Sequence, residues 1–279
     1  GVYMTLKISG ATSHGTRTGV TAPNTTKDGE VVESTISNGM LYIYDGSTCV
    51  FRKIITSDMF ETAPSQTVVG KTKPIKVAVT GQIKTNKEYT VYFLANKKDV
   101  NDPLNASFTS TMSGADFAAD NSFVMFNQHD VSRDASASKV KFTDAAKSEA
   151  TPAEADEIKL DRVVARIDLP TFKEVTTVTP ATNTKTSINA ANIIEGIALE
   201  GYAVSNLNNT SYVKQNWTVV NTDWTLNVLT AGTPKYFLNK ATYGTKYEPD
   251  GLDNFGTDKW KYAFENTTTD VDDATAVYF

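Results

Sequence analysis

The chain has 279 residues, with 27 lysines and arginines against 32 aspartates and glutamates, which gives a formal net charge of −5. This acidic balance provides no basic surface, so nucleic acid is not an expected partner. No apolar run approaches the ~18 residues that a membrane-spanning helix needs. The length suffices for two domains of ordinary size, each with its own core.

The first ten residues predict a strand that is buried on one face. Four apolar residues alternate with polar ones, namely Val2, Met4, Leu6 and Ile8. A period of two is typical of a half-buried strand, so we expect these four side chains to point into a core and Lys7 to face solvent. The chain begins inside this strand without an initiator methionine, which predicts that an upstream segment has been removed.

The polar stretch after this strand predicts a protease-sensitive tether. Residues 13–19 read SHGTRTG, with Arg17 among small residues and glycines. Such a segment is expected to be extended and exposed, as proteolysis requires. From the residues alone, an ordinary first strand followed by an ordinary loop is the favoured interpretation.

Short strands dominate the rest of the first half. They are predicted over residues 40–44, 75–79, 89–95, 122–126 and 140–142, with a turn at Asp45-Gly46 and a hairpin-like connection over residues 80–87. Helical patterning is sparse, with its best cases near residues 58–60 and 116–119. Many short strands with few helices are typical of a mainly β protein built from sandwiches.

A domain boundary is expected near residue 172. Residues 143–157 are acidic and rich in alanine, and they predict a solvated connection that could contain a helical turn. Residues 176–187 predict a loop. Strand patterns return over residues 193–204, 217–220, 235–238 and 259–264. The chain stops as a further strand begins at Ala276, so the second domain is expected to be incomplete.

The sequence predicts no catalytic, cofactor or metal site. His14 and His129 have no partner at the spacing of a zinc site. Residues 99–103 resemble the start of a calcium loop, but Pro103 and the absence of a distal glutamate favour a simple Asx turn. Cys49 is expected to be a partly buried small side chain rather than a nucleophile.

The second half is rich in large aromatic side chains, which are Trp217, Trp224, Trp260 and Tyr262. They could form a platform on which a sugar stacks. Aromatic residues also fill sandwich cores, and core packing is the favoured interpretation.

Several motifs together resemble the fimbrillins of the Bacteroidales, the type V pilins. The first is VYMTLKISGATSHGTR followed by the strand LYIY. The others follow in the same order, as YTVYFLAN (89–96), FVMFN (123–127), LDRVVARID (160–168) and, more weakly, IIEGIALEGYAVSNLNNTSYV (193–213). The family's lipobox cysteine is not in this sequence, and the terminal strands of its second domain are missing.

The resemblance implies two tandem, transthyretin-like β-sandwich domains, over residues 1–172 and 173–279. It implies export as a lipoprotein precursor and an outer-membrane-attached fimbria that supports cell adhesion. An arginine-specific, trypsin-like protease would cut between Arg17 and Thr18. The strand that carries Val2, Met4, Leu6 and Ile8 would then be removable, and other pilin subunits would be the partners, with host or bacterial surface ligands also possible.

Two arginines, Arg162 and Arg166, flank the expected domain boundary. They either pair with acidic groups or carbonyls there or remain solvated. In this stretch Val163, Ala165 and Ile167 are expected on one face of a strand.

Three classes of function remain open. The chain is a structural pilus subunit, a surface adhesin that binds glycans or proteins, or a secreted hydrolase. The last class would need paired carboxylates in a cleft. The resemblance favours the pilus subunit.

Overall fold

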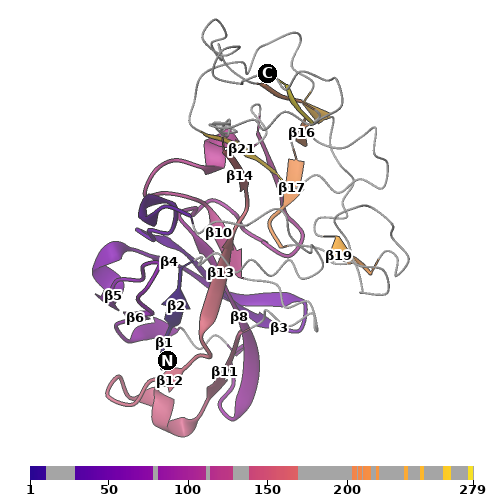
Figure 1. The fold of residues 1–279 in the computed structure, drawn as a ribbon. Helices are drawn as coiled ribbons and strands as arrows, with labels where there is room; N and C mark the ends of the chain where they lie inside the picture. The colour runs from indigo at the N-terminus through magenta and orange to yellow at the C-terminus, as the bar shows by residue number, and fades with distance from the viewer. Residues whose placement is uncertain are drawn as a thin grey trace, which may run out of the picture.

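The computed structural model describes residues 1–10, 29–77, 81–110, 114–127, 138–168, 203–205, 207–208, 210–214, 218–219, 236–237, 246–247, 260–264 and 276–278. Regular structure in these residues consists of β-strands and short 3₁₀ helices (Figure 1). Within this part of the chain, none of the helices has the length and apolar character to cross a membrane. The predicted mainly β class is confirmed.

Two sheets organise the first half of the chain. The larger contains β2 (Lys7–Ser9), β3 (Gly39–Asp45), β4 (Thr48–Ile55), β5 (Phe60–Thr62), β6 (Gly70–Thr72), β8 (Lys87–Ala95), β10 (Met125–Asn127), β11 (Ser138–Phe142) and β13 (Ile158–Arg162). Its order is β4-β3-β8-β10-β13-β2-β6-β5, with β11 also on β8. The smaller sheet has the order β12-β1-β7, from β1 (Val2–Thr5), β7 (Ile75–Val77) and β12 (Ala153–Glu154).

Strands β3 and β8 separate two apolar clusters. Leu41 and Phe93 point into the first cluster, where they meet the apolar face of β1 and β2. Tyr42 and Tyr92 point to the opposite face and join the second cluster. Burial on both faces explains why these two strands are the most continuously apolar runs of the sequence.

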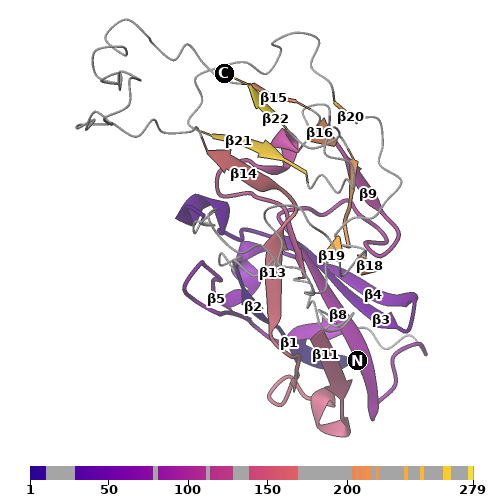
Figure 2. The ribbon, with the colours of Figure 1, turned by 45° about the vertical axis from the view of Figure 1, so that its right-hand side comes forward.

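Elements from the second half pair with one another and with the first half (Figure 2). The pairs are β14 (Ala165–Asp168) with β21 (Trp260–Ala263), β15 (Ala203–Ser205) with β22 (Ala276–Tyr278), β16 (Leu207–Asn208) with β20 (Lys246–Tyr247), β18 (Thr218–Val219) with β19 (Tyr236–Phe237), and β17 (Thr210–Tyr212) with β9 (Ser107–Thr109). Residues 169–202 lie outside the described residues, and the boundary near residue 172 stays a prediction.

Two expected connections differ in the structure. Residues 80–87 do not close a hairpin, because β7 pairs with β1 whereas β8 pairs with β3, β10 and β11. Residues 143–157 contain the helical turn that the sequence allowed, but they are not simply solvated. They form η4 (Asp144–Lys147) and β12, and their small side chains Ala146 and Ala155 are buried in the first cluster. Alanine fits there because β1 lies close by.

The other helical turns lie near the predicted positions or at sites the sequence did not indicate. They are η2 (Ser57–Met59), η3 (Ala115–Phe117) and η1 (Val31–Glu33). The alternation expected after Arg162 is also interrupted. A bend at residues 163–164 separates β13 from β14, so Val164 is buried in the second cluster while Ala165 is exposed.

Two asparagine side chains form hydrogen bonds with main-chain groups. Asn127 accepts a bond from the amide of Phe93 at 2.7 Å and donates to the carbonyl of Val91 at 3.2 Å. Asn96 has a positive φ of 61°, which asparagine tolerates better than most residues. Its amide nitrogen donates to the carbonyls of Thr35 and Phe123, at 2.8 Å each.

Candidate functional site: the N-terminal strand

The N-terminal strand lies between neighbours on both sides. Its first part, β1, pairs in parallel with β12 (Met4 opposite Ala153) and antiparallel with β7 (Met4 opposite Ile75). Its second part, β2, pairs in parallel with β13 and antiparallel with β6 (Figures 1 and 2). Removing this strand would therefore leave edges of β7 and β12 in the smaller sheet and of β6 and β13 in the larger sheet unpaired.

The strand also fills the first apolar cluster. Its four alternating apolar side chains are each at most 1% exposed, as the sequence predicts, and they are Val2, Met4, Leu6 and Ile8. Each fully buried side chain of this size contributes about 1.5–3 kcal/mol, so the strand supplies several kcal/mol to the stability of the fold. Without it, the cluster would be open along a groove.

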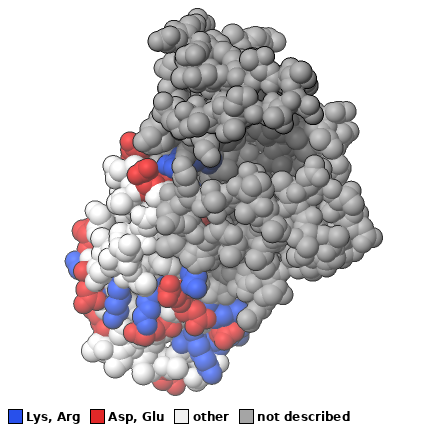
Figure 3. Space-filling model, viewed as in Figure 1, with Lys and Arg blue, Asp and Glu red and all other residues white. Residues whose placement is uncertain are grey.

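The outward face of the strand is polar. The side chain of Lys7 is 43% exposed and pairs with Glu154 at 3.1 Å, so Lys7 faces solvent as predicted. The visible surface of the described residues carries charges of both signs (Figure 3). Such exposed pairs contribute little to stability, so the apolar side chains and main-chain bonds hold the strand.

The two described residues that flank the tether, Gly10 and Gly29, are tightly packed. A Cβ at Gly10 would lie 3.0 Å from the carbonyl oxygen of Ser34, and at Gly29 it would clash with the guanidinium of Arg162 and the carboxylate of Glu33. Arg17 and Thr18, the predicted cleavage position, lie outside the described residues, as do His14 and His129.

A second polar constellation lies where β13 gives way to β14. Glu33, at 2% exposed, accepts bonds on Oε1 from Arg166 Nη1 at 2.9 Å and from the hydroxyl of Tyr262 at 3.0 Å. Arg162 donates from Nε to the Glu33 carbonyl at 2.9 Å and from Nη2 to the hydroxyl of Ser34 at 2.8 Å. The interpretation that the two arginines pair with acidic groups or carbonyls is confirmed, for Arg166 through a carboxylate and for Arg162 through a carbonyl.

Sequence reasoning missed Glu33, the acceptor at the centre of this constellation. The available signal was a capping box, in which the Glu33 carboxylate accepts the amide of Glu30 at 2.9 Å at the start of η1. Burial and the bond to Glu33 raise the pKa of Tyr262, and burial lowers the pKa of Arg162. The geometry joins a segment just after the tether to β14 and β21.

The aromatic residues of the second half can be placed only in part. Tyr262 packs edge-on against Phe123, with ring centroids 5.2 Å apart, and lies against the second cluster. This position agrees with core packing rather than a sugar platform. Trp217 and Trp224, and the side chain of Trp260, lie outside the described residues.

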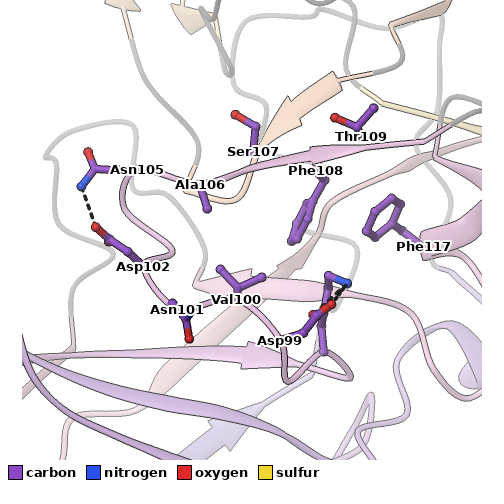
Figure 4. A pocket seen from close by; sticks show the side chains of 11 residues that line it. Asp99, Val100, Asn101, Asp102, Asn105, Ala106, Ser107, Phe108, Thr109 and Phe117 are labelled. Atoms are coloured by element: carbon purple, nitrogen blue, oxygen red, sulfur yellow. Dashed lines mark hydrogen bonds and ion pairs between the residues drawn. The ribbon is translucent and has the colours of Figure 1, made fainter.

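The calcium-like stretch forms an Asx turn beside an open hollow of about 490 Å³ (Figure 4). The carboxylate of Asp102 accepts bonds from the amide of Leu104, the side chain of Asn105 and the hydroxyl of Tyr44. These bonds, the side-chain bond from Asn105 first, hold the pKa of Asp102 below its usual value. The carboxylate therefore binds internal donors. The described residues contain no cluster of three potential metal ligands.

Cys49 lies in β4, is half-buried and is a free thiol, as predicted. Burial raises the pKa of this thiol. A nucleophilic cysteine needs the opposite shift, because the thiolate is the reactive form.

No family model matches the chain, and no match is found among curated proteins. Among solved structures, a fimbrial assembly protein from Parabacteroides distasonis ATCC 8503 is similar with a TM-score of 0.42 and 16% identity, over 95% of this chain and 77% of that one. A fimbrilin from Porphyromonas gingivalis W83 is similar with a TM-score of 0.36 and 13% identity, over 89% of this chain and 72% of that one. Neither similarity is close enough to assign a function.

Proposed function

We propose that this chain is a structural subunit of a pilus, which polymerises by donor-strand exchange once its N-terminal strand has been removed. The observation that carries the proposal is the position of β1 and β2, hydrogen-bonded on both sides and buried through four apolar side chains. The sequence resemblance to the fimbrillins supports the same interpretation. The uncut chain is then a blocked monomer, because its own strand fills the groove.

Removal of the strand would create a template for another strand. The exposed groove would offer main-chain partners on β6, β7, β12 and β13, with apolar pockets at alternate positions, which is the pattern of β-strand addition. A donor strand from a neighbouring subunit would pair with these main chains and fill these pockets. Because donor and groove lie on different surfaces, the contact is heterologous and propagates as an open filament.

The cut is proposed at Arg17, by a trypsin-like protease that recognises arginine. The tether runs over residues 11–28, between the packed Gly10 and the anchored Gly29. A cut there separates the strand from the remaining chain without breaking any of the strand pairings of β1 and β2. Export as a lipoprotein precursor, attachment to the outer membrane and support of adhesion belong to the same proposal.

The test combines limited proteolysis with assembly. Trypsin is expected to cut the wild-type chain first after Arg17, and Arg17→Ala should abolish this early cut while the monomer stays folded. Arg52→Ala, in the folded β4, is the matched control and should leave the early cut unchanged. Intact mass identifies the cut, and size-exclusion chromatography with electron microscopy follows assembly. A chain that is cut at Arg17 but never assembles, even with added donor segment, would contradict the proposed function.

A further inference from the structure

The N-terminal strand changes neighbours at its centre. On one side β6 ends at Thr72 and β7 begins at Ile75, with Pro74 between them. On the other side β12 ends at Glu154 and β13 begins at Ile158. The β6/β7 side is thus interrupted opposite Thr5 and Leu6. The β12/β13 side, where Thr5 still lies opposite Glu154, is interrupted opposite Leu6 and Lys7. Here the strand passes from the smaller sheet to the larger one.

Thr72 holds the main chain of Leu6 at this crossing. The amide of Leu6 donates to the side-chain hydroxyl oxygen of Thr72 at 2.9 Å. The carbonyl of Leu6 accepts from the amide of Thr72 at 3.1 Å. A side chain therefore replaces the main-chain acceptor that the interrupted ladder does not provide. Thr72 is fully buried, so no water can take over this role.

Thr5 weakens the same crossing. It is only 3% exposed, and its hydroxyl oxygen has no hydrogen-bond partner among the residues that the structure describes. A buried hydroxyl without a partner costs free energy that an aliphatic side chain of the same shape does not. The strand thus carries an unfavourable group at the point where its neighbours are interrupted.

We infer that Thr72 and Thr5, which we call the seam, set with opposite signs how long the N-terminal strand stays in place. Thr72 stabilises the strand in its groove. The unpaired hydroxyl of Thr5 makes the strand bind the groove less tightly than it would with an aliphatic residue at that position. An incoming strand with an aliphatic residue at the register of Thr5 would bind more tightly and displace the resident strand. This last step rests on the proposed function, whereas the roles of the two threonines in the uncut chain do not.

The first experiment uses the full, uncut chain. Native-state hydrogen exchange, read by mass spectrometry on residues 1–10, reports how often this segment opens. Thr5→Val is expected to slow exchange by about tenfold, because it removes the unpaired hydroxyl. Thr72→Val is expected to speed exchange by about tenfold or more, because it leaves the Leu6 amide without an acceptor.

Three controls separate the seam from general effects. Thr5→Ser keeps the hydroxyl and should not slow exchange, and Thr72→Ser keeps the acceptor and should stay near the wild type. Thr48→Val, at an exposed position of β4, tests strand propensity alone and should leave residues 1–10 unchanged. If Thr72→Val does not fold, Thr5→Val decides the question. Exchange in Thr5→Val that is no slower than in the wild type overturns the inference.

The second experiment uses the chain after the cut at Arg17. A labelled synthetic peptide of residues 1–10 is added in excess, and fluorescence polarisation follows its entry. Chains with Thr5→Val should release their own strand about tenfold more slowly than the wild type, and a peptide with the same substitution should compete better than the natural one. Rates of strand release and peptide competition that do not change with this substitution overturn the inference about Thr5 and Thr72. If no variant takes up peptide but the expected hydrogen-exchange differences are observed, the proposed function is contradicted. The roles assigned to Thr5 and Thr72 in the uncut chain are then still supported.

Discussion

Glu33 and Arg166 lie 133 residues apart in the sequence and form a hydrogen-bonded ion pair of 2.9 Å in the structure. Arg162 and Tyr262 contact the same glutamate. One glutamate thereby joins the segment after the tether to β13, β14 and β21.

Replacing Glu33 with glutamine should destabilise the chain by about 3–5 kcal/mol, because it removes the buried negative charge that pairs with Arg166. Urea unfolding followed by tryptophan fluorescence measures this change. Glu30→Gln is the matched control, since the Glu30 side chain is 53% exposed and lies 3.8 Å from Arg166. It should change stability by less than about 0.5 kcal/mol. Equal effects of the two substitutions would show that the buried pair contributes nothing special.

Shortening a side chain of the N-terminal strand should lower the stability of the fold only on the apolar face of the strand. Leu6→Ala is expected to lower the unfolding free energy by about 2–5 kcal/mol, because it opens a cavity in the first cluster. Lys7→Ala should cost less than about 1 kcal/mol, since it removes only an exposed ion pair. Thermal and urea unfolding of the uncut chain provide the comparison. Similar losses at both positions would contradict the assigned orientation of the strand.

Replacing the side-chain amide of Asn127 should lower the stability of the fold. Asn127→Leu keeps the size of the side chain but leaves the amide of Phe93 and the carbonyl of Val91 without this partner, at a cost of about 2–4 kcal/mol. Asn101→Leu, at an exposed position, is the control and should stay within about 0.5 kcal/mol of the wild type. Hydrogen exchange should also quicken in β8 for Asn127→Leu. Unchanged protection of Phe93 would contradict the bridging role.

The Asx turn at Asp102 should give a pH dependence of stability. The folded pKa of this carboxyl lies below its unfolded value of about 3.9. Its contribution is therefore complete above the unfolded pKa and is lost as the pH falls through the folded pKa. The stability difference between wild type and Asp102→Asn should shrink as the pH is lowered from about 5 to about 2. A difference that stays constant over this range would contradict the assigned hydrogen bonds.

Sequence patterns correctly predicted the features that neighbouring residues in the sequence determine. The alternation of Val2 to Ile8 was sufficient to orient the first strand, because a strand buried on one face admits only one register of inward side chains. The Asx turn at Asp102 and the partial burial of Cys49 were predictable for the same reason, since near neighbours determine them.

Features that depend on distant segments escaped prediction. Glu33 looked like any exposed glutamate, since Arg166 and Tyr262 meet it only after folding. The connection over residues 80–87 resembles a hairpin locally, but β1 and β3 are stronger partners for its two flanking strands. Ala146 and Ala155 were assigned to solvent because alanine has little hydrophobicity, whereas close approach of β1 favours small side chains there.

The parallel pairing of the N-terminal strand also has a consequence for the order of folding. Met4 and Ile8 find their parallel partners only at Ala153 and Ile158, far later in the sequence. About half of the chain must therefore be made, or exported, before the strand can settle. Contacts of such long sequence separation slow folding and prolong the exposure of apolar surface. The N-terminal strand is thus made well before its parallel partners, and until they arrive the groove is open to any other strand.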